Sequence, residues 1–263
     1  MELSAQQEPF PHLRGGAGAA VLLVPGLGGR TDFFSAQLPL LAERWTVIAW
    51  DQRGVGARES EPACHSPAEL AADVASMLDD LTGRPVALVG HSMGAGICQH
   101  FALDGAARIE GMVLSSAWAK PEDKFRALIA KRRQILESEG PAAYLAASAR
   151  MSLPQSAGAV IDTDALAERA ATLDVVEELA RLDALHAHDL SARVSEIELP
   201  VELLAAADDR LTPLKMSEDL AERLPQSRLT ILEHGGHMAP QANPDEYSSA
   251  LIHSLERLLP ATH

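Results

Sequence analysis

The chain has 263 residues, of which 47% are hydrophobic and 22% are charged, and its formal net charge is −15. This length and composition are typical of a globular protein with one large core. The acidic balance argues against nucleic acid and anionic membrane surfaces as partners, because binding to phosphate groups requires clustered Lys and Arg.

Short apolar runs alternate with longer amphipathic segments along the chain. Nearly continuous apolar runs predict buried parallel strands at 19–26, 46–52, 86–92, 111–118 and 201–209, and a further strand is predicted at 228–234. Amphipathic patterns predict helices at 32–44, 66–81, 97–107, 213–224 and 243–259. The alternation predicts an α/β fold with a doubly wound, mostly parallel sheet and right-handed crossovers.

One long segment interrupts this alternation with helical patterns alone, at 124–140, 141–151 and 163–190. It follows the strand that ends near Trp118, at the carboxyl edge of the sheet, where such folds bind ligands. We therefore expect a single domain over residues 1–263. Its core covers about 17–120 and 195–263, and a helical cap covers about 121–194.

The stretch Gly90-His91-Ser92-Met93-Gly94 lies between a predicted buried strand and a predicted helix. In this context G-x-S-x-G predicts a sharp turn that lifts the serine hydroxyl above the sheet. The helix that follows directs free N–H groups to the same point, where they stabilise a negative oxygen. Ser92 is therefore our candidate nucleophile, and the alternative is a tight turn that contains a serine without chemical function.

A serine nucleophile needs a base, and the base needs an acid to orient its ring. Two adjacent acids, Asp208 and Asp209, end the strand predicted at 201–209. Two histidines, His234 and His237, end the last predicted strand and the loop after it. The residues thus supply serine, acid and histidine in that chain order.

Five stretches resemble the α/β-hydrolase superfamily: VPGLGG, WDQRGVG, VGHSMGAG, AADDRLTP and HGGHMAP. The resemblance runs from about residue 19 to the last helix and is nearest to bacterial enol-lactone hydrolases and aminoacrylate hydrolases. It implies Asp209 as the acid, because the family pattern is Asp followed by Arg-x-Thr-Pro, and it implies His237 as the base. His234 is then a structural or surface residue.

An oxyanion hole needs two backbone N–H donors that face the developing charge. Met93, the residue after the nucleophile, supplies one of them. The resemblance places the second on Leu27, in the loop that begins at Pro25, where many relatives have histidine. The alternative is a glycine-rich turn without chemical function.

Other residues receive weaker assignments. WDQRGVG resembles an architectural turn of the family in which Arg53 makes a buried ion pair. We expect His91 to point away from the pocket. Trp118 and Ser116 are candidates for the pocket wall, although Trp118 fits equally well as core beneath the cap.

An anionic substrate of so acidic a protein needs a local cation. Arg30 and Arg133 are the predicted candidates, whereas Lys131 and Arg132 are expected to face water. We expect no metal site and no cofactor, because neither the Cys nor the His spacing suits a metal.

The predicted function is hydrolysis of a small ester or lactone through an acyl-enzyme on Ser92, in a monomer or homodimer. The alternatives are a C–N hydrolase of the aminoacrylate or amide type and a non-catalytic ligand-binding relative. No apolar run reaches the roughly 18 residues of a membrane span, and the N-terminal residues lack the pattern of a signal peptide. The expected location is the cytoplasm.

Overall fold

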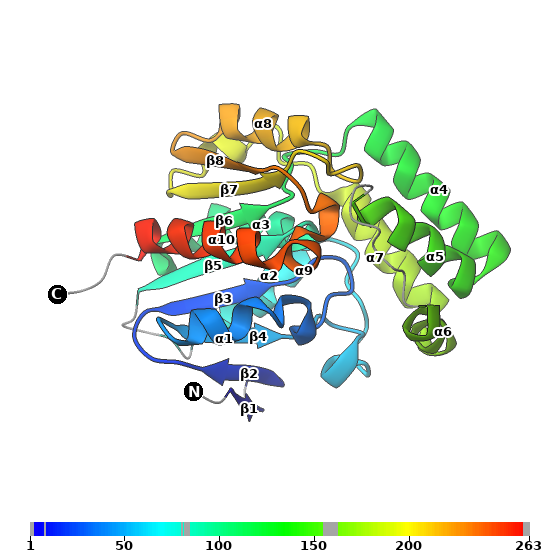
Figure 1. Cartoon of the computed structure of the whole chain (residues 1–263), viewed down its shortest axis with the longest axis horizontal. Coiled ribbons are helices and arrows are strands. Elements are labelled where there is room, and N and C mark those ends of the chain that lie inside the picture. Colours follow the sequence, from blue (N-terminus) through cyan, green and yellow to red (C-terminus); the bar gives the residue numbers. More distant parts are fainter. Residues whose placement is uncertain (1–2, 8, 80, 82–84, 155–162, 260–263) are drawn as a thin grey trace.

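In the part of the chain that the structure describes, an eight-stranded sheet has the order β1-β2-β4-β3-β5-β6-β7-β8 (Figure 1). The computed structural model describes residues 3–7, 9–79, 81, 85–154 and 163–259. From β4 to β8 every neighbouring pair is parallel, as the alternation predicts. The strands are β1 (Ser4–Gln6), β2 (His12–Gly15), β3 (Ala20–Val24), β4 (Thr46–Trp50), β5 (Val86–His91), β6 (Gly111–Ser115), β7 (Val201–Ala206) and β8 (Ser227–Leu232).

The two N-terminal strands were not predicted from the sequence. β2 pairs antiparallel with β4, and β1 pairs antiparallel with β2. They have four and three residues, too few for a period of two to stand out. What makes them strands is the free edge of β4, which only the tertiary structure supplies.

The parallel strands bury both faces, which explains their continuous apolar runs. Along β3, Ala20, Leu22 and Val24 join the core on one face, whereas Val21 and Leu23 join the core on the other. Helices α2 (Pro67–Asp79), α3 (Met93–Gly105) and α8 (Leu214–Arg223) contribute to the first core, and α1 (Gln37–Ala42) and α10 (Pro244–Leu258) to the second. Shorter helical segments are Thr31–Phe34, Gly56–Arg58, Ala106–Arg108, Val194–Glu196, Gly236–Met238 and α9 (Ala239–Ala242).

Among the described residues, four α-helices, called the cap below, are inserted between β6 and β7: α4 (Asp123–Glu139), α5 (Pro141–Ser152), α6 (Thr163–Thr172) and α7 (Val175–Ala187). They lie together beside one end of the sheet (Figure 1). The apolar cluster on the first face of the sheet continues into them through Phe125, Tyr144 and Leu182. None of the described helices has both the length and the apolar character needed to cross a membrane.

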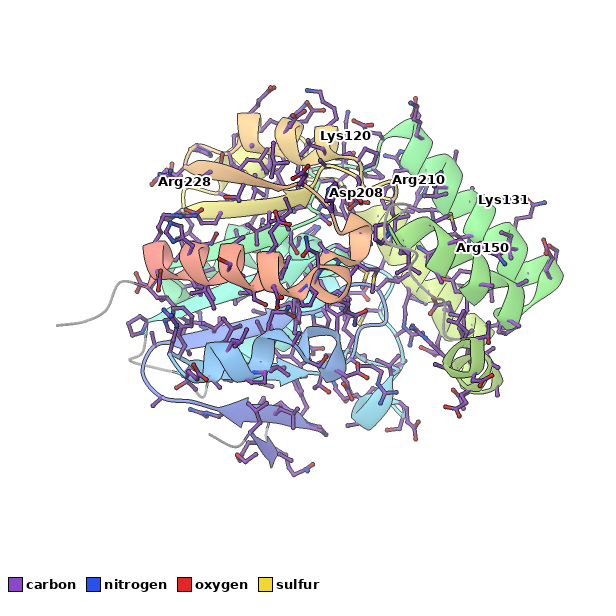
Figure 2. The ribbon with its side chains drawn as sticks, in the orientation of Figure 1. Lys120, Lys131, Arg150, Asp208, Arg210 and Arg228 are labelled. Carbon is purple, nitrogen blue, oxygen red and sulfur yellow. The ribbon has the colours of Figure 1, made fainter. Side chains whose placement is uncertain are left out.

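The prediction that Arg132 faces water is wrong, because its side chain is buried between two cap helices. Arg132 is 8% exposed. Its Nη2 donates to the Tyr144 hydroxyl at 2.7 Å and its Nε donates to Ser148 Oγ at 3.1 Å. Lys131, the preceding residue on α4, is exposed, as predicted, and projects from the outer side of the cap (Figure 2).

The ion pair predicted for Arg53 differs from that in the structure. Arg53 donates to both oxygens of Asp73, but its side chain is 32% exposed. The buried guanidinium is that of Arg58, which is 2% exposed and binds both Asp73 and Glu61. The carboxylate of Asp73 therefore binds two arginines, Arg53 and Arg58.

Helix α3 begins directly against the end of β3. A methyl group on Gly94 would lie 2.0 Å from the carbonyl oxygen of Val24 and 2.5 Å from that of Pro25. Both obstacles are backbone atoms next to a central strand, so they have little room to move. Gly96 lies in the same helix, and a methyl group there would lie 3.2 Å from the His188 ring. That ring belongs to a side chain, which has more room to move than the backbone atoms next to Gly94.

We expect Gly94→Ala to lower the melting temperature by about 10 °C or more, because the overlap outweighs the gain in helix propensity. Gly96→Ala, the matched control with the same propensity gain, should change it by less than about 3 °C. Thermal unfolding followed by circular dichroism measures both. Equal stability of the two variants would contradict the proposed close contact.

Candidate active site

Ser92 lies on the tight turn between β5 and α3. Its backbone has φ 55° and ψ −120°, a conformation that residues other than glycine rarely adopt. A methyl group on Gly90 would lie 2.6 Å from the Gly94 carbonyl oxygen and 2.7 Å from Ala95 Cα. Glycine at this position therefore allows the turn to close, and Gly94 allows the new helix to approach β3.

His237 bridges Ser92 and Asp209. Its Nε2 lies 2.9 Å from Ser92 Oγ, and its Nδ1 lies 2.9 Å from Asp209 Oδ2. All three residues are at least 93% buried, with exposures of 7% for Ser92 and 5% for the other two. The structure therefore brings together the three residues that the sequence predicts as nucleophile, base and acid.

The Asp209 carboxylate is surrounded by hydrogen-bond donors. Its Oδ1 accepts from the amides of Leu211 and Thr212 at 2.8 and 2.9 Å. Its Oδ2 accepts from the hydroxyls of Thr212 and Ser116 at 2.8 and 3.0 Å, besides His237 Nδ1. The pattern Asp-Arg-x-Thr-Pro contained the signal for Thr212, whereas the role of Ser116 could not be read from the sequence.

These contacts determine the ionisation of Asp209. Burial raises its pKa, but the positive charge of His237 and the hydrogen bonds from His237 and Thr212 outweigh burial and lower the pKa to about 2. An ionised acid holds Nδ1 of His237 as the donor nitrogen. Nε2 is then free to accept the proton of Ser92.

Asp208 has a different position from its neighbour. Its Oδ1 accepts from the amide of Gly236 at 2.8 Å, while its Oδ2 is buried without a hydrogen-bond partner in the described structure. Asp208 thus holds the loop just before His237. The side chain of His234 is 59% exposed and lies near Glu233.

The expectation that His91 points away from the site is wrong. Its ring centroid lies 5.1 Å from that of His237, and its Nδ1 lies 2.8 Å from Ser115 Oγ, which also accepts from the Tyr247 hydroxyl. Burial first, and then the charge of His237, hold the pKa of His91 well below its ordinary value. His91 is therefore a neutral ring packed against the base.

The loop from Pro25 to Gly29 adjoins the nucleophile, because a methyl group on Gly26 would lie 3.3 Å from Ser92 Cβ. Gln52, at the end of β4, holds both ends of this loop. Its side-chain amide donates to the Pro25 carbonyl at 2.7 Å, and its backbone amide donates to the Gly29 carbonyl at 3.0 Å. In the described residues no acceptor engages the amides of the two predicted oxyanion donors, Leu27 and Met93.

The structure places the two predicted pocket-wall residues in the interior. Trp118 is 1% exposed and packs edge-on against Phe125, with ring centroids 5.0 Å apart. Its position agrees with the expectation of core beneath the cap. Ser116 has φ 50° and donates to Asp209, so its side chain supports the acid.

The two predicted cations, Arg30 and Arg133, have acidic neighbours. The side chain of Arg30 is 58% exposed and lies 4.0 Å from Asp32. Arg133 pairs with Asp183 and lies 3.6 Å from Glu137. Neither arginine contacts Ser92, Asp209 or His237 in the described structure.

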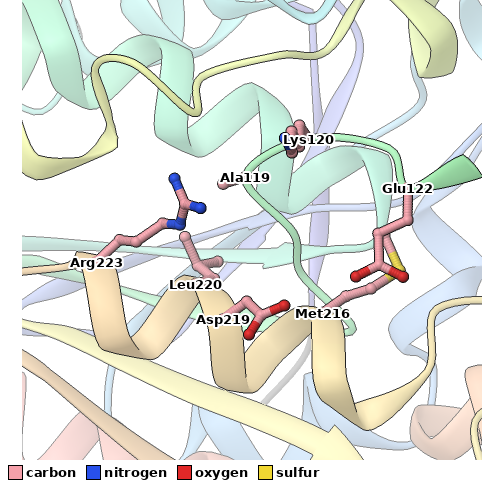
Figure 3. Close-up of a pocket in the computed structure, with 7 residues that line it drawn as sticks. All are labelled: Ala119, Lys120, Glu122, Met216, Asp219, Leu220 and Arg223. Carbon is pink, nitrogen blue, oxygen red and sulfur yellow. The ribbon is translucent and has the colours of Figure 1, made fainter.

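A separate pocket lies between α8 and the connection from β6 to α4 (Figure 3). It contains none of the predicted site residues and is lined by Ala119, Lys120, Glu122, Met216, Asp219, Leu220 and Arg223. Two cations and two acids leave it without net charge. Among the described residues, no group of three His, Cys, Asp or Glu side chains is arranged to hold a metal.

Comparisons with known proteins identify the family of the chain. The family model described as serine aminopeptidase S33 matches residues 15–241. RutD of Caulobacter vibrioides, by its name a proposed carbamate hydrolase, is 33% identical over 241 residues, which are 90% of this chain and 90% of that protein. RutD of Escherichia coli strain IAI39 is 30% identical over 272 residues and covers 98% of this chain and 97% of its own.

Solved structures share the fold. A hydrolase from Pseudomonas aeruginosa has a TM-score of 0.82 at 25% identity and covers 97% of this chain and 98% of its own. The enol-lactonase from Burkholderia xenovorans LB400 has a TM-score of 0.82 at 20% identity, with coverage of 93% and 95%. The second likeness supports the fold alone.

The low pKa of Asp209 predicts a pH-dependent contribution to stability. Because the folded pKa, about 2, is below the ordinary value of 3.8, the contribution is complete above pH 4 and is lost as pH falls toward 2. The free energy of unfolding of the wild type, relative to Asp209→Asn, should therefore fall by about 1 kcal/mol between pH 5 and pH 3. Urea unfolding at these two pH values measures it, and a constant difference would contradict the charged pair.

Proposed function

Because the chain belongs to the serine aminopeptidase S33 family of the α/β-hydrolase superfamily, we propose that it hydrolyses a small acyl compound through a covalent intermediate on Ser92. The observation that carries the proposal is the continuous hydrogen bonding from Ser92 Oγ through His237 to Asp209, with 2.9 Å at each step. A ligand-binding relative without chemistry would have no need for all three groups in this order.

In the first half of the reaction, His237 Nε2 takes the proton of Ser92 Oγ as that oxygen attacks the carbonyl carbon of the substrate. The carbonyl oxygen becomes an oxyanion, and the amides of Leu27 and Met93 are the donors proposed to receive it. The tetrahedral intermediate then breaks its bond to the leaving group, which takes the proton from His237. The acyl group remains on Ser92.

In the second half, a water molecule repeats the attack on the acyl-enzyme. His237 Nε2 accepts a proton from the water, the oxyanion forms in the same place, and Ser92 Oγ leaves with the proton. Throughout, Asp209 stays ionised and stabilises the imidazolium. The low pKa of Asp209 supports this role, since a protonated acid could not do so.

For the scissile bond, we propose an ester or lactone as the first candidate. An alkoxide leaving group needs only the proton that His237 already carries, so the three residues suffice for the reaction.

A carbamate is the second candidate. Relatives that cover 90% or more of this chain at 30% to 33% identity have names that describe carbamate hydrolases. The same machinery would form a carbamoyl group on Ser92. A panel of one p-nitrophenyl ester, one lactone and one small carbamate, compared by kcat/KM, ranks the two candidates.

We expect an organophosphonate ester with a p-nitrophenyl leaving group to add one adduct, at Ser92, because only an activated serine attacks phosphorus readily. Ser92→Ala should lose both the adduct and turnover of p-nitrophenyl acetate while keeping its circular dichroism spectrum. Ser138→Ala, an exposed serine on α4, is the matched control and should keep both. Intact-mass measurement and peptide mapping locate the adduct, and labelling elsewhere with activity retained would exclude Ser92.

Replacement of the acid distinguishes Asp209 from its neighbour. Asp209→Asn should lower kcat on the order of 10⁴-fold, because the asparagine favours the wrong tautomer of His237. Asp208→Asn should lower it by less than about tenfold, since Asp208 contacts a backbone amide of the loop and no triad side chain. Steady-state kinetics with p-nitrophenyl acetate gives both values. The reverse order would assign the acid to Asp208.

A further inference from the structure

A buried arginine on the cap has an unused hydrogen-bond donor beside the proposed oxyanion loop, residues 25–29. Arg181, on α7, is 5% exposed. Its Nη1 donates to Glu178 Oε2 at 3.0 Å, and its Nη2 donates to the Gly54 carbonyl at 2.8 Å. Its Nε is buried and has no hydrogen-bond partner in the described part of the chain. A buried donor without a hydrogen bond destabilises the folded protein, and a ligand or a water molecule that accepts from it would remove this cost.

The groups around Arg181 form a buried polar network. Glu178 accepts from both Arg181 and the Tyr144 hydroxyl, and Tyr144 in turn accepts from Arg132. Two buried guanidinium groups therefore share one buried carboxylate. Glu177, the acid preceding Glu178, accepts a hydrogen bond from the backbone amide of Ala63. Glu177 also lies near Arg181, because a methyl group on Gly54 would lie 3.4 Å from Glu177 Oε2 and 2.4 Å from Arg181 Nη2. The unused Nε donor of Arg181, and not an excess of charge, is therefore what a ligand would satisfy.

A second arginine reaches the same place. A methyl group on Gly28 would lie 3.5 Å from Arg181 Nε and 3.9 Å from Arg169 Nη2. Arg169 lies on α6, is exposed, and forms no ion pair within the described residues. Gly28 has φ 56° and immediately follows Leu27, the proposed oxyanion donor. Two guanidinium groups with free donors thus meet at a residue that has no side chain.

We propose that Arg181 and Arg169 bind a carboxylate group of the substrate beside the oxyanion loop. A carboxylate presents two acceptor oxygens, one for each guanidinium, and such charge-assisted hydrogen bonds are the strong ones. The enzyme then prefers acyl compounds that carry a carboxylate near the scissile carbonyl. This inference adds a substrate class to the proposed function, and its kinetic test rests on that function.

The same observations favour these two arginines over the pair chosen from the sequence. Arg30 and Arg133 lie beside acids and have no buried donor without a partner among the described residues. Arg181 also pairs with an acid, Glu178, but its buried Nε has no partner there. Arg181 and Arg169 come from successive cap helices. Their convergence on Gly28 exists only in the folded chain.

The kinetic test compares two substrates with the same leaving group: mono-p-nitrophenyl glutarate, which is an anion, and methyl p-nitrophenyl glutarate, which is neutral. The measured quantity is the ratio of their kcat/KM values. Arg169→Gln and Arg181→Lys should each lower this ratio by about tenfold or more. Arg169 is exposed, so its variant keeps the test valid if Arg181→Lys folds poorly.

Lys131→Gln is the matched control, because it removes one positive charge from the outer side of the cap (Figure 2). It should leave both kcat/KM values at the wild-type level. An unchanged ratio in Arg169→Gln and Arg181→Lys would overturn the proposal. A selective loss in Arg30→Gln or Arg133→Gln instead would also overturn it.

A binding test separates this inference from the proposed catalysis. Calorimetry with Ser92→Ala should detect glutarate but not dimethyl glutarate, and adding Arg169→Gln to this variant should weaken glutarate binding by about tenfold. Adding Lys131→Gln should leave binding unchanged. If Ser92→Ala kept full turnover, the proposed mechanism would fail, yet loss of glutarate binding with Arg169 would still support the carboxylate site. Equal binding with and without Arg169 would overturn the site whatever the turnover.

Discussion

The tight turn at Ser92 is the constraint on which the rest of the site depends. Ser92 has a backbone conformation unfavourable for any residue with a side chain, and the glycines on either side remove atoms that would collide. The cost of this conformation is offset by the central position of the turn, because β5 pairs with β3 and β6 and α3 packs into the core. The hydroxyl therefore stands at one place, and every other group of the site is positioned relative to it.

Loops from both sides of the sheet centre converge on that hydroxyl and are held by polar contacts. On one side Gln52 holds both ends of the loop from Pro25 to Gly29. On the other, Asp209 accepts hydrogen bonds from two backbone amides, two hydroxyls and His237. Each contact lies on a loop that follows a parallel strand, so the carboxyl edge of the sheet brings them together. Groups held in this way need little reorganisation when charge develops on the substrate.

The cap adds a different kind of chemistry to this rigid edge. Its helices share an apolar cluster with the sheet, but they also bury Arg132, Glu178 and Arg181, and the Arg181 side chain reaches Gly28. In a protein with a net charge of −15, an arginine with an unused donor is a place where an anionic group can bind. The core thus supplies the groups proposed to break the bond, and the cap supplies the arginines proposed to select substrate charge.

The sequence alone determined the parallel sheet, the order of its elements along the chain and the turn that carries Ser92. The choice of Asp209 over Asp208 and of His237 over His234 came from the family resemblance of the sequence. Continuous apolar strands and helical periodicity are local signals, and the turn chemistry around Ser92 and Asp209 depends on residues near one another in the chain. The tertiary structure alone decided the strands β1 and β2, the contact of His91 with His237 and the support of Asp209 by Ser116. It also decided that Arg132 is buried and that Arg169 and Arg181 converge on Gly28. These features depend on which faces of different elements pack together. A periodic pattern gives the period of a helix but does not identify the neighbour that each face will meet.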